Sequence, residues 1–131
     1  MKKEIDKDSW EYKFAEIKKT RPKDFKKAYR MKWGVRKRMV DFMYALYLHY
    51  CEWVRYVDSL DKFYDSFHGC IPTDVCGELE RAKRNAWMGL SRVNGFVDAM
   101  RLSGIEVEMV IDTVIVGFPL LGLTVLPEKE A

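Results

Sequence analysis

Two histidines and three cysteines are the side chains of this sequence best suited to hold a metal ion. Zinc binds His and Cys in tetrahedral geometry, most often through paired Cys-x-x-Cys spacing. That spacing is absent here, although His68, Cys70 and Cys76 are near one another in the sequence. We therefore keep these three residues as metal-ligand candidates and expect no cofactor. His49 and Cys51 fall inside a long apolar helical pattern, where packing or hydrogen bonding is the better interpretation.

The thiols and carboxylates are the candidates for a catalytic role. Cys76 stands near the start of a predicted helix, where its thiolate would be favoured. No orienting third group and no oxyanion-binding loop accompanies it at recognisable spacing. Glu106 and Glu108 alternate along a predicted strand and are interpreted as solvent-facing residues rather than a carboxylate pair. Because the phosphate-binding loop, the dinucleotide glycine motif and the nucleophile elbow are also absent, we expect a protein that is not an enzyme.

The strongest chemical signal is electrostatic and lies between Lys18 and Arg38. These 21 residues hold eleven Lys or Arg and a single acid, Asp24, for a net charge of +10, whereas the whole chain carries +3. The other 110 residues therefore sum to −7. A positive field this concentrated attracts polyanions or acidic protein surfaces.

Projected as a helix over residues 23–38, this segment divides into an aromatic side and a cationic side. Phe25, Tyr29 and Trp33 are four residues apart and share one face. Cations on one helix face suit contact with phosphates, and rings at its border suit base stacking. The predicted binding residues are Lys23, Lys26, Lys27, Arg30, Lys32, Arg36, Lys37 and Arg38, with Tyr29 and Trp33 as stacking candidates.

Three functions fit this pattern. The preferred one is a small binding protein whose basic helix engages nucleic acid or a nucleoprotein complex, with DNA and RNA left open. The first alternative is a protein-binding inhibitor or adaptor, of the type that mobile elements encode, whose basic face occupies an acidic or nucleic-acid-binding groove of a host enzyme. The second is a ligand-binding protein or enzyme with a pocket between helices and sheet. Acidic residues around 58–65 and 78–80 could instead neutralise part of the charge within the molecule.

Three helices are predicted to position these residues. The first covers residues 8–19 and is capped by Asp8 or Ser9. The second covers residues 22–67, running from the basic segment into a long apolar stripe with a mean step of about 3.6 residues. Gly34 is a candidate break in this helix. The third covers residues 73–103, with apolar residues in steps of four and three.

The connection between the second and third helices predicts an antiparallel hairpin. Gly69 suits the end of one helix and Pro72 precedes the start of the next. Helices of similar length joined by a short turn pack side by side. Three small residues would let the third helix approach the aromatic side chains of the second: Ala82, Ala86 and Gly89.

The period changes to two at residue 105, which predicts β-structure over residues 105–126 and a tail at 127–131. Turns are expected at Asp112–Thr113 and Gly117–Pro119, giving a two- or three-stranded antiparallel sheet. Residues 109–126 form the longest apolar run, but Asp, Gly and Pro interrupt it. We therefore expect strands rather than a transmembrane segment.

One α+β domain of 131 residues follows from these elements, since 48% apolar residues are enough for a core. The alternative is a mostly α fold whose C-terminal β-hairpin serves oligomerisation. The apolar last strand makes a homo-oligomer paired through the C-terminal strands a further hypothesis. An odd number of cysteines and an N-terminus without an apolar leader indicate a cytoplasmic protein.

Overall fold

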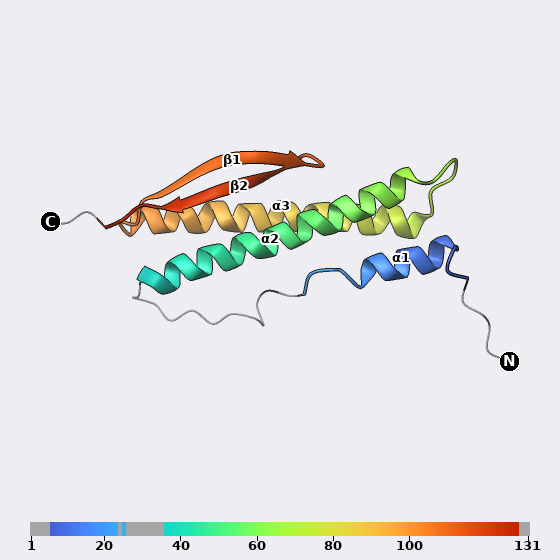
Figure 1. Cartoon of the computed structure of the whole chain (residues 1–131), viewed down its shortest axis with the longest axis horizontal. Helices are drawn as coiled ribbons and strands as arrows, with labels where there is room; N and C mark the ends of the chain where they lie inside the picture. The colour runs from blue at the N-terminus through green and yellow to red at the C-terminus, as the bar shows by residue number, and fades with distance from the viewer. Residues whose placement is uncertain (1–5, 24, 26–35, 129–131) are drawn as a thin grey trace.

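The computed structural model describes residues 6–23, 25 and 36–128 and has an α+β fold, as the sequence predicts. A short helix, α1 (Trp10–Lys18), precedes two long helices, α2 (Arg36–Asp65) and α3 (Thr73–Leu102). A β-hairpin of β1 (Val107–Ile115) and β2 (Phe118–Val125) follows. Figure 1 shows α2 and α3 side by side, with the hairpin on one side of the pair and α1 on the other. The predicted α+β architecture with its helical hairpin is confirmed.

The short helix α1 forms where its cap and apolar face predict it. The Ser9 hydroxyl accepts a hydrogen bond from the Tyr12 backbone N–H at 3.3 Å, which satisfies a donor of the first turn. Phe14 is buried and its ring lies parallel to that of Phe63 on α2, with centroids 6.1 Å apart. Packing against α2 holds this helix in place, because nine residues are too few for a stable isolated helix.

The start of the predicted second helix differs from the expectation. Arg21, Pro22 and Lys23 have no regular secondary structure, so this helix does not begin at Pro22. The Lys23 carbonyl accepts a hydrogen bond from Nε2 of His49 at 2.9 Å, and this bond fixes the connection on α2. The rest of the predicted basic helix, including the break at Gly34, lies outside the described residues.

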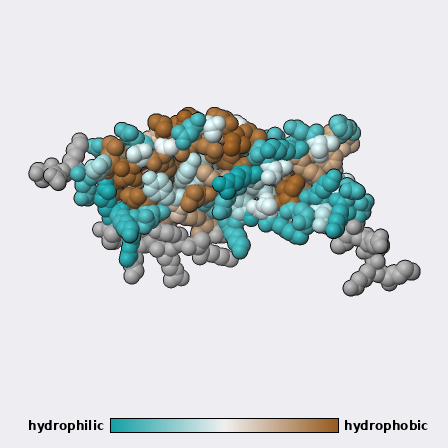
Figure 2. All heavy atoms as spheres, viewed as in Figure 1, coloured by the Kyte–Doolittle hydropathy of each residue, from teal (hydrophilic) through white to brown (hydrophobic). Residues whose placement is uncertain are grey.

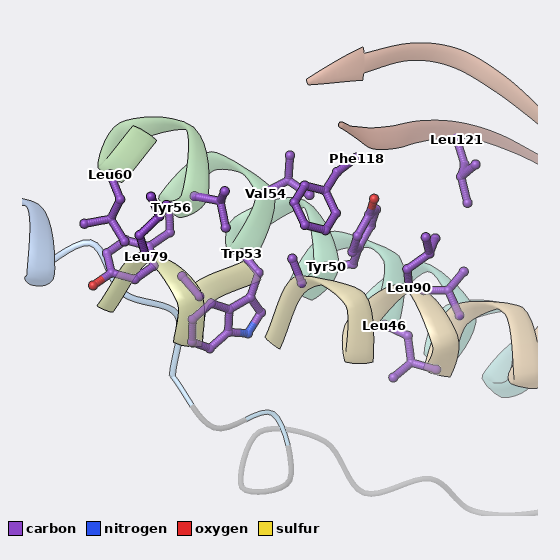
Figure 3. Close-up of a cluster of buried hydrophobic side chains, with 14 of the residues drawn as sticks. Leu46, Tyr50, Trp53, Val54, Tyr56, Leu60, Leu79, Leu90, Phe118 and Leu121 are labelled. Atoms are coloured by element: carbon purple, nitrogen blue, oxygen red, sulfur yellow. The ribbon is translucent and has the colours of Figure 1, made fainter. Parts of the chain in front are cut away.

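Close packing of α2 against α3 builds the core. Ala82 and Ala86 are fully buried, and a Cβ on Gly89 would lie 3.4 Å from the Cα of Tyr50. The predicted close approach of small residues to aromatic ones is therefore confirmed. Figure 3 shows Tyr50 between the helices and the hairpin, with Phe118 and Leu121 pointing from the strands into the same cluster.

Helix α3 ends where glycine permits a left-handed residue. Gly104 has φ +87°, its N–H donates to the Arg101 carbonyl, and the Ile105 N–H donates to the Met100 carbonyl at 2.9 Å. This is the Schellman arrangement, in which two orphan carbonyls of the last turn are satisfied. Ile105 and Met100 are both buried, so the same motif also turns the chain back onto the helices.

The β region forms two strands, and one of its expected turns is a bulge. The strands are antiparallel, with Ile111 opposite Leu121 and Thr113 opposite Leu120, so Asp112 is the extra residue of a β-bulge. The turn is at Val116–Gly117, whose φ angles of +45° and +84° are those of a type I′ turn. No helix in the described parts of the chain combines the length and apolar content that crossing a bilayer requires.

Three tyrosines of α2 attach β2 to the helices. The hydroxyls of Tyr44 and Tyr50 donate to the carbonyls of Leu123 and Pro119 at 3.1 and 2.8 Å. The hydroxyl of Tyr47 accepts from the Leu121 N–H at 3.0 Å. Because the three tyrosines are three residues apart on one helix and their partners alternate along one strand, a regular set of hydrogen bonds joins the two elements.

Candidate functional site

A groove with a basic and aromatic lining lies on the side of the helix pair away from the sheet. Arg21, Pro22, Lys23 and Phe25, which follow α1, lie on this side of the helix pair and form one wall (Figure 1). The groove has a volume of about 230 Å³. None of the described residues that line it is acidic. They are Arg21, Pro22, Lys23, Phe25, His49, Trp53, Asn85, Met88 and Arg92.

Aromatic packing sets the position of this wall. The Phe25 ring lies 5.1 Å from the His49 ring and 5.7 Å from the Phe42 ring, measured between centroids. His49 also lies edge-on to Trp53, at 6.4 Å. The histidine thus has the packing and hydrogen-bonding role that the sequence indicates, since its Nε2 bonds the Lys23 carbonyl. Through this bond His49 holds the backbone of Lys23 beside the groove that Lys23 lines.

Glu78 balances one of the groove's cations from inside the protein. Its side chain is buried, its Oε1 accepts a hydrogen bond from the Tyr56 hydroxyl at 2.6 Å, and the same oxygen lies 3.7 Å from NH1 of Arg21. Burial, and then the bond to Glu78, raises the pKa of Tyr56. A buried carboxylate is stable only with such partners. Arg21 is therefore partly neutralised, whereas none of the described ion pairs includes Lys23 or Arg92.

A second groove, between α1 and the start of α3, has a mixed lining and a volume of about 570 Å³. Lys18 and Arg81 lie on it together with the acids Glu11, Asp74 and Glu78. Opposite charges interspersed in this way cancel at a distance, so the attraction for a polyanion is greatest at the first groove.

An apolar groove of about 430 Å³ continues the basic one. It shares Phe25 and Arg92 with the basic groove and adds Phe42, Leu46 and Phe96. The rings of Phe42 and Phe96 meet edge to face, with centroids 4.9 Å apart. Cationic and flat apolar surface are thus adjacent, which is the combination that binds unstacked bases along a charged backbone.

The residues predicted from the basic segment are found in different surroundings. Lys23 lies at the basic groove, and Lys37 and Arg38 are exposed on the first turn of α2. Arg36 instead ties α2 to the end of the hairpin, because its NH2 donates to the Leu126 carbonyl at 2.7 Å and its Nε lies 3.4 Å from Glu128. Six of the predicted residues lie outside the described part of the chain: Lys26, Lys27, Tyr29, Arg30, Lys32 and Trp33.

Sequence reasoning missed the contribution of α3 to this groove. Asn85, Met88 and Arg92 follow one another at steps of three and four, which places them on one helix face. The periodicity was available in the sequence, but the apolar positions of the same helix carry the stronger pattern. Only the packing of α3 beside the segment after α1 shows that Asn85, Met88 and Arg92 join Lys23.

The thiol and imidazole candidates are in separate settings. Cys70 and His68 are exposed in the connection between α2 and α3, and Cys76 is half-buried in the first turn of α3. Within the described residues, no group of three or more His, Cys, Asp and Glu side chains could hold a metal ion. Cys51 is half-buried on α2, where burial raises the pKa of its thiol.

Comparison of the chain with protein-family models, curated proteins and solved structures found no significant match to any of them. The site is therefore interpreted from its own residues.

Proposed function

We propose that the protein is a small binding protein whose basic groove and adjoining basic segment engage a polyanion, with single-stranded nucleic acid as the preferred ligand. The observation that supports this most directly is the lining of the groove. Three cations, an imidazole and an amide surround a space bordered by aromatic rings, and no acid is among the lining residues that the structure describes. Phosphates are attracted by the cations, and the amide and imidazole supply neutral polar groups that can reach a sugar or a base.

The shape of the site favours single strands over duplexes. The groove is small, with a volume of about 230 Å³, and it continues into an apolar groove bordered by Phe25 and Phe42. A duplex keeps its bases stacked inside, so rings at the bottom of a groove cannot reach them. An unpaired base can stack on aromatic side chains for about 1–3 kcal/mol.

Fluorescence anisotropy with labelled single- and double-stranded DNA and RNA at several salt concentrations tests the proposal. The critical variant is Lys23→Glu with Arg92→Glu, which removes two exposed cations from the groove. We expect weaker binding, and a log–log salt slope for single strands that is shallower by about 1.4, because each lost phosphate contact removes about 0.7. Phe25→Leu, which keeps apolar volume at the groove, should weaken single-strand binding and leave the salt slope unchanged.

The matched control is Arg55→Glu with Lys62→Glu, which changes the net charge equally on the exposed side of α2, away from the groove. It should bind nearly as the unmodified protein does. Equal losses in the two double variants would show that binding depends on net charge alone and would overturn the assignment of the groove. If the protein binds none of these nucleic acids at low salt, nucleic acid is excluded as its direct ligand.

A protein target is the second candidate, and the exposed apolar side chains of the helices favour it. Trp87 and Met88 are each about half exposed, and Leu102 is 91% exposed. Trp and Met are enriched in the centres of protein interfaces. If the protein is an inhibitor or adaptor, we expect tight binding to one acidic partner that persists at high salt. Met88→Ser should then reduce the affinity for that partner as much as substitution of the groove cations does.

A further inference from the structure

The two free edges of the β-hairpin are not equivalent. The hydroxyls of Tyr44, Tyr47 and Tyr50 bond backbone groups of Pro119, Leu121 and Leu123, so these residues of β2 direct their polar groups away from β1 and toward α2. Pro119 has no N–H, which suits an edge position. The outer edge of β2 is therefore already occupied within the molecule.

Antiparallel geometry then determines which backbone groups of β1 point outward. Met109 lies opposite Leu123 and Ile111 lies opposite Leu121. Residues that face each other in an antiparallel pair either both bond across the ladder or both direct their groups outward. Because Leu121 and Leu123 bond α2, the N–H and C=O groups of Met109 and Ile111 point away from β2.

The outer edge of β1 is hydrogen-bonded to α3 at its first residue, and, within the described part of the chain, the outward backbone groups farther along the strand are free to pair. Near α3, Nε and NH2 of Arg101 donate to the Val107 carbonyl at 3.2 and 2.8 Å. Among the described residues, no hydrogen bond from outside the hairpin reaches the backbone of Met109 or Ile111. An open strand edge of this kind is a template for another strand.

The side chains along this edge are apolar and acidic. Val110, Ile111 and Val114 are 58%, 66% and 58% exposed, and the exposed acids Glu108 and Asp112 lie on either side of Val110 in the sequence. Residues 105–126 contain three acids and no Lys or Arg. In Figure 2 hydrophobic residues gather along the upper margin, where Figure 1 places the hairpin.

We propose that the open edge of β1 binds an extended peptide segment of a partner, in which Lys or Arg alternates with Val, Ile or Leu on one face. The backbone of Met109 and Ile111 supplies the ladder, Val110 contacts an apolar residue of the peptide, and Glu108 and Asp112, on the same face as Val110, pair with the cations on either side of it. This is β-strand addition, where main-chain bonds supply affinity and alternate side chains supply specificity. A basic peptide is a different class of ligand from the polyanion, and it binds on the other side of the helix pair.

A second copy of β1 fits the edge less well than a basic strand. When the strand pairs with itself about Val110, Glu108 of each copy lies opposite Asp112 of the other. Shifting the centre to Glu108 or Asp112 places an acid opposite itself, and a centre at Ile111 places Asp112 opposite Val110 and Glu108 opposite Val114, so that neither acid meets a cation. Like charges directly opposite one another destabilise a strand pair. No self-pairing register gives these acids a cation, so the charge of the edge favours a cationic partner over self-association.

The probe is a fluorescein-labelled heptapeptide of sequence VTKTVTK, with capped ends, whose Val and Lys side chains alternate on one face. Its matched controls are VTETVTE and a backbone N-methylated VTKTVTK, which lacks donors for the ladder. The protein variants are Ile111→Pro, which removes an outward N–H that β2 does not use, and Ile111→Thr, which retains it. Glu108→Lys with Asp112→Lys reverses the charge of exposed side chains.

We expect the unmodified protein and Ile111→Thr to bind VTKTVTK and to slow hydrogen exchange at the Met109 and Ile111 amides. Ile111→Pro and the charge-reversed variant should each bind it at least about tenfold more weakly. Both control peptides should bind poorly. Circular dichroism checks that Ile111→Pro keeps its fold, and the charge-reversed variant tests the same edge independently.

Two results would overturn the proposal. Binding of VTETVTE as tight as that of VTKTVTK would remove the charge argument. A concentration-dependent dimer in sedimentation experiments, lost in Ile111→Pro, would show that the edge is occupied by a second copy. The proposal does not depend on the function of the groove, since Lys23→Glu with Arg92→Glu should leave peptide binding intact.

Discussion

Val116 carries the clearest local strain in the described chain. It is a β-branched residue with φ +45°, in the first position of a type I′ turn that favours Asn or Gly. A left-handed conformation costs an ordinary residue about 1–2 kcal/mol. The half-buried Val116 side chain packs against the core and offsets part of that cost.

Val116→Asn should stabilise the protein by about 0.5–1 kcal/mol, because Asn accepts positive φ and precedes Gly117 in the preferred order. The midpoint of urea denaturation measures this. Val116→Ala is the control, since it loses the packing but keeps the strain and should therefore destabilise. A gain in the Ala variant as large as that in the Asn variant would contradict the backbone explanation.

The raised pKa of Tyr47 predicts how the stability of the fold changes at alkaline pH. Burial, followed by its hydrogen bond with Cys51, raises the pKa of Tyr47 to about 12, against about 10 in an unfolded chain. The unfolded state therefore loses its proton first, and stability that is present below about pH 10 is lost as the pH rises toward 12. Tyr50 and Tyr56, whose pKa values are also raised by burial, act in the same direction.

Urea midpoints measured across this alkaline range should fall steeply in the unmodified protein. Tyr47→Phe should be less stable at neutral pH, since the Leu121 N–H loses its acceptor, and its midpoint should fall less steeply above about pH 10. An equal slope in both proteins would show that Tyr47 does not take part in the transition.

At the scale of the elements, glycines at two positions of α3 have opposite effects. A Cβ on Gly89 would lie 3.4 Å from both Cα and Cβ of Tyr50, whereas one on Gly95 would meet nothing within 4 Å. Gly89→Val should cost about 1–3 kcal/mol, because its added methyl groups must separate two packed helices. Gly95→Ala should add about 0.5–1 kcal/mol from helix propensity alone.

Thermal and urea denaturation of both variants measure this contrast. Gly77→Ala is a second open position on the same helix and should behave as Gly95→Ala does. If Gly89→Val were neutral, the close approach of α2 and α3 would not be set by this residue.

The sequence predicted the type of each helix and strand better than it predicted where each one begins and ends. Helical periodicity located both long helices, and Gly69, Gly104 and Gly117 all adopt positive φ near element ends. Asp112 was expected in a turn and lies in a bulge, because Asp at this position is compatible with either and the pairing of β1 with β2 decides between them. The non-helical segment at Pro22 is joined to α2 by the bond between Lys23 and His49, which are distant in sequence, so no local pattern reveals this contact.

At the scale of the whole molecule, α1 should be the least stable unit. It has nine residues and is attached largely through Phe14 and through Trp10, whose ring lies 6.4 Å from that of Phe67. Phe14→Ala should therefore release α1 locally, since a helix this short does not persist without packing. Hydrogen exchange should show loss of protection in α1, with Val93 and Val97 in α3 unchanged.

A parallel loss of protection at Val93 and Val97 would contradict this prediction and show that α1 unfolds together with the core. The result also bears on function, because α1 forms one wall of the mixed groove and leads into the segment that borders the basic one.

The small net charge of +3 conceals two local surfaces of opposite sign, the basic groove and the outer edge of β1. The cations of the basic groove lie on the side of α2 and α3 away from the hairpin, and the acids of β1 lie on the opposite side. The two proposals follow from this division, with a polyanion on one side and a basic strand on the other. The sequence showed the excess of positive charge but not the place of the acids relative to it.

The sequence by itself determined the two long helices, the β region and the positions of several turns, because these depend on backbone preferences and on apolar spacing within a few residues. It also identified Lys23 as a binding candidate. Only the tertiary structure joined Lys23 to Asn85 and Arg92, and only it showed that the tyrosines of α2 occupy the edge of β2 and leave that of β1 open. These arrangements join residues such as Tyr47 and Leu121, 74 positions apart, whose contact depends on how whole elements pack.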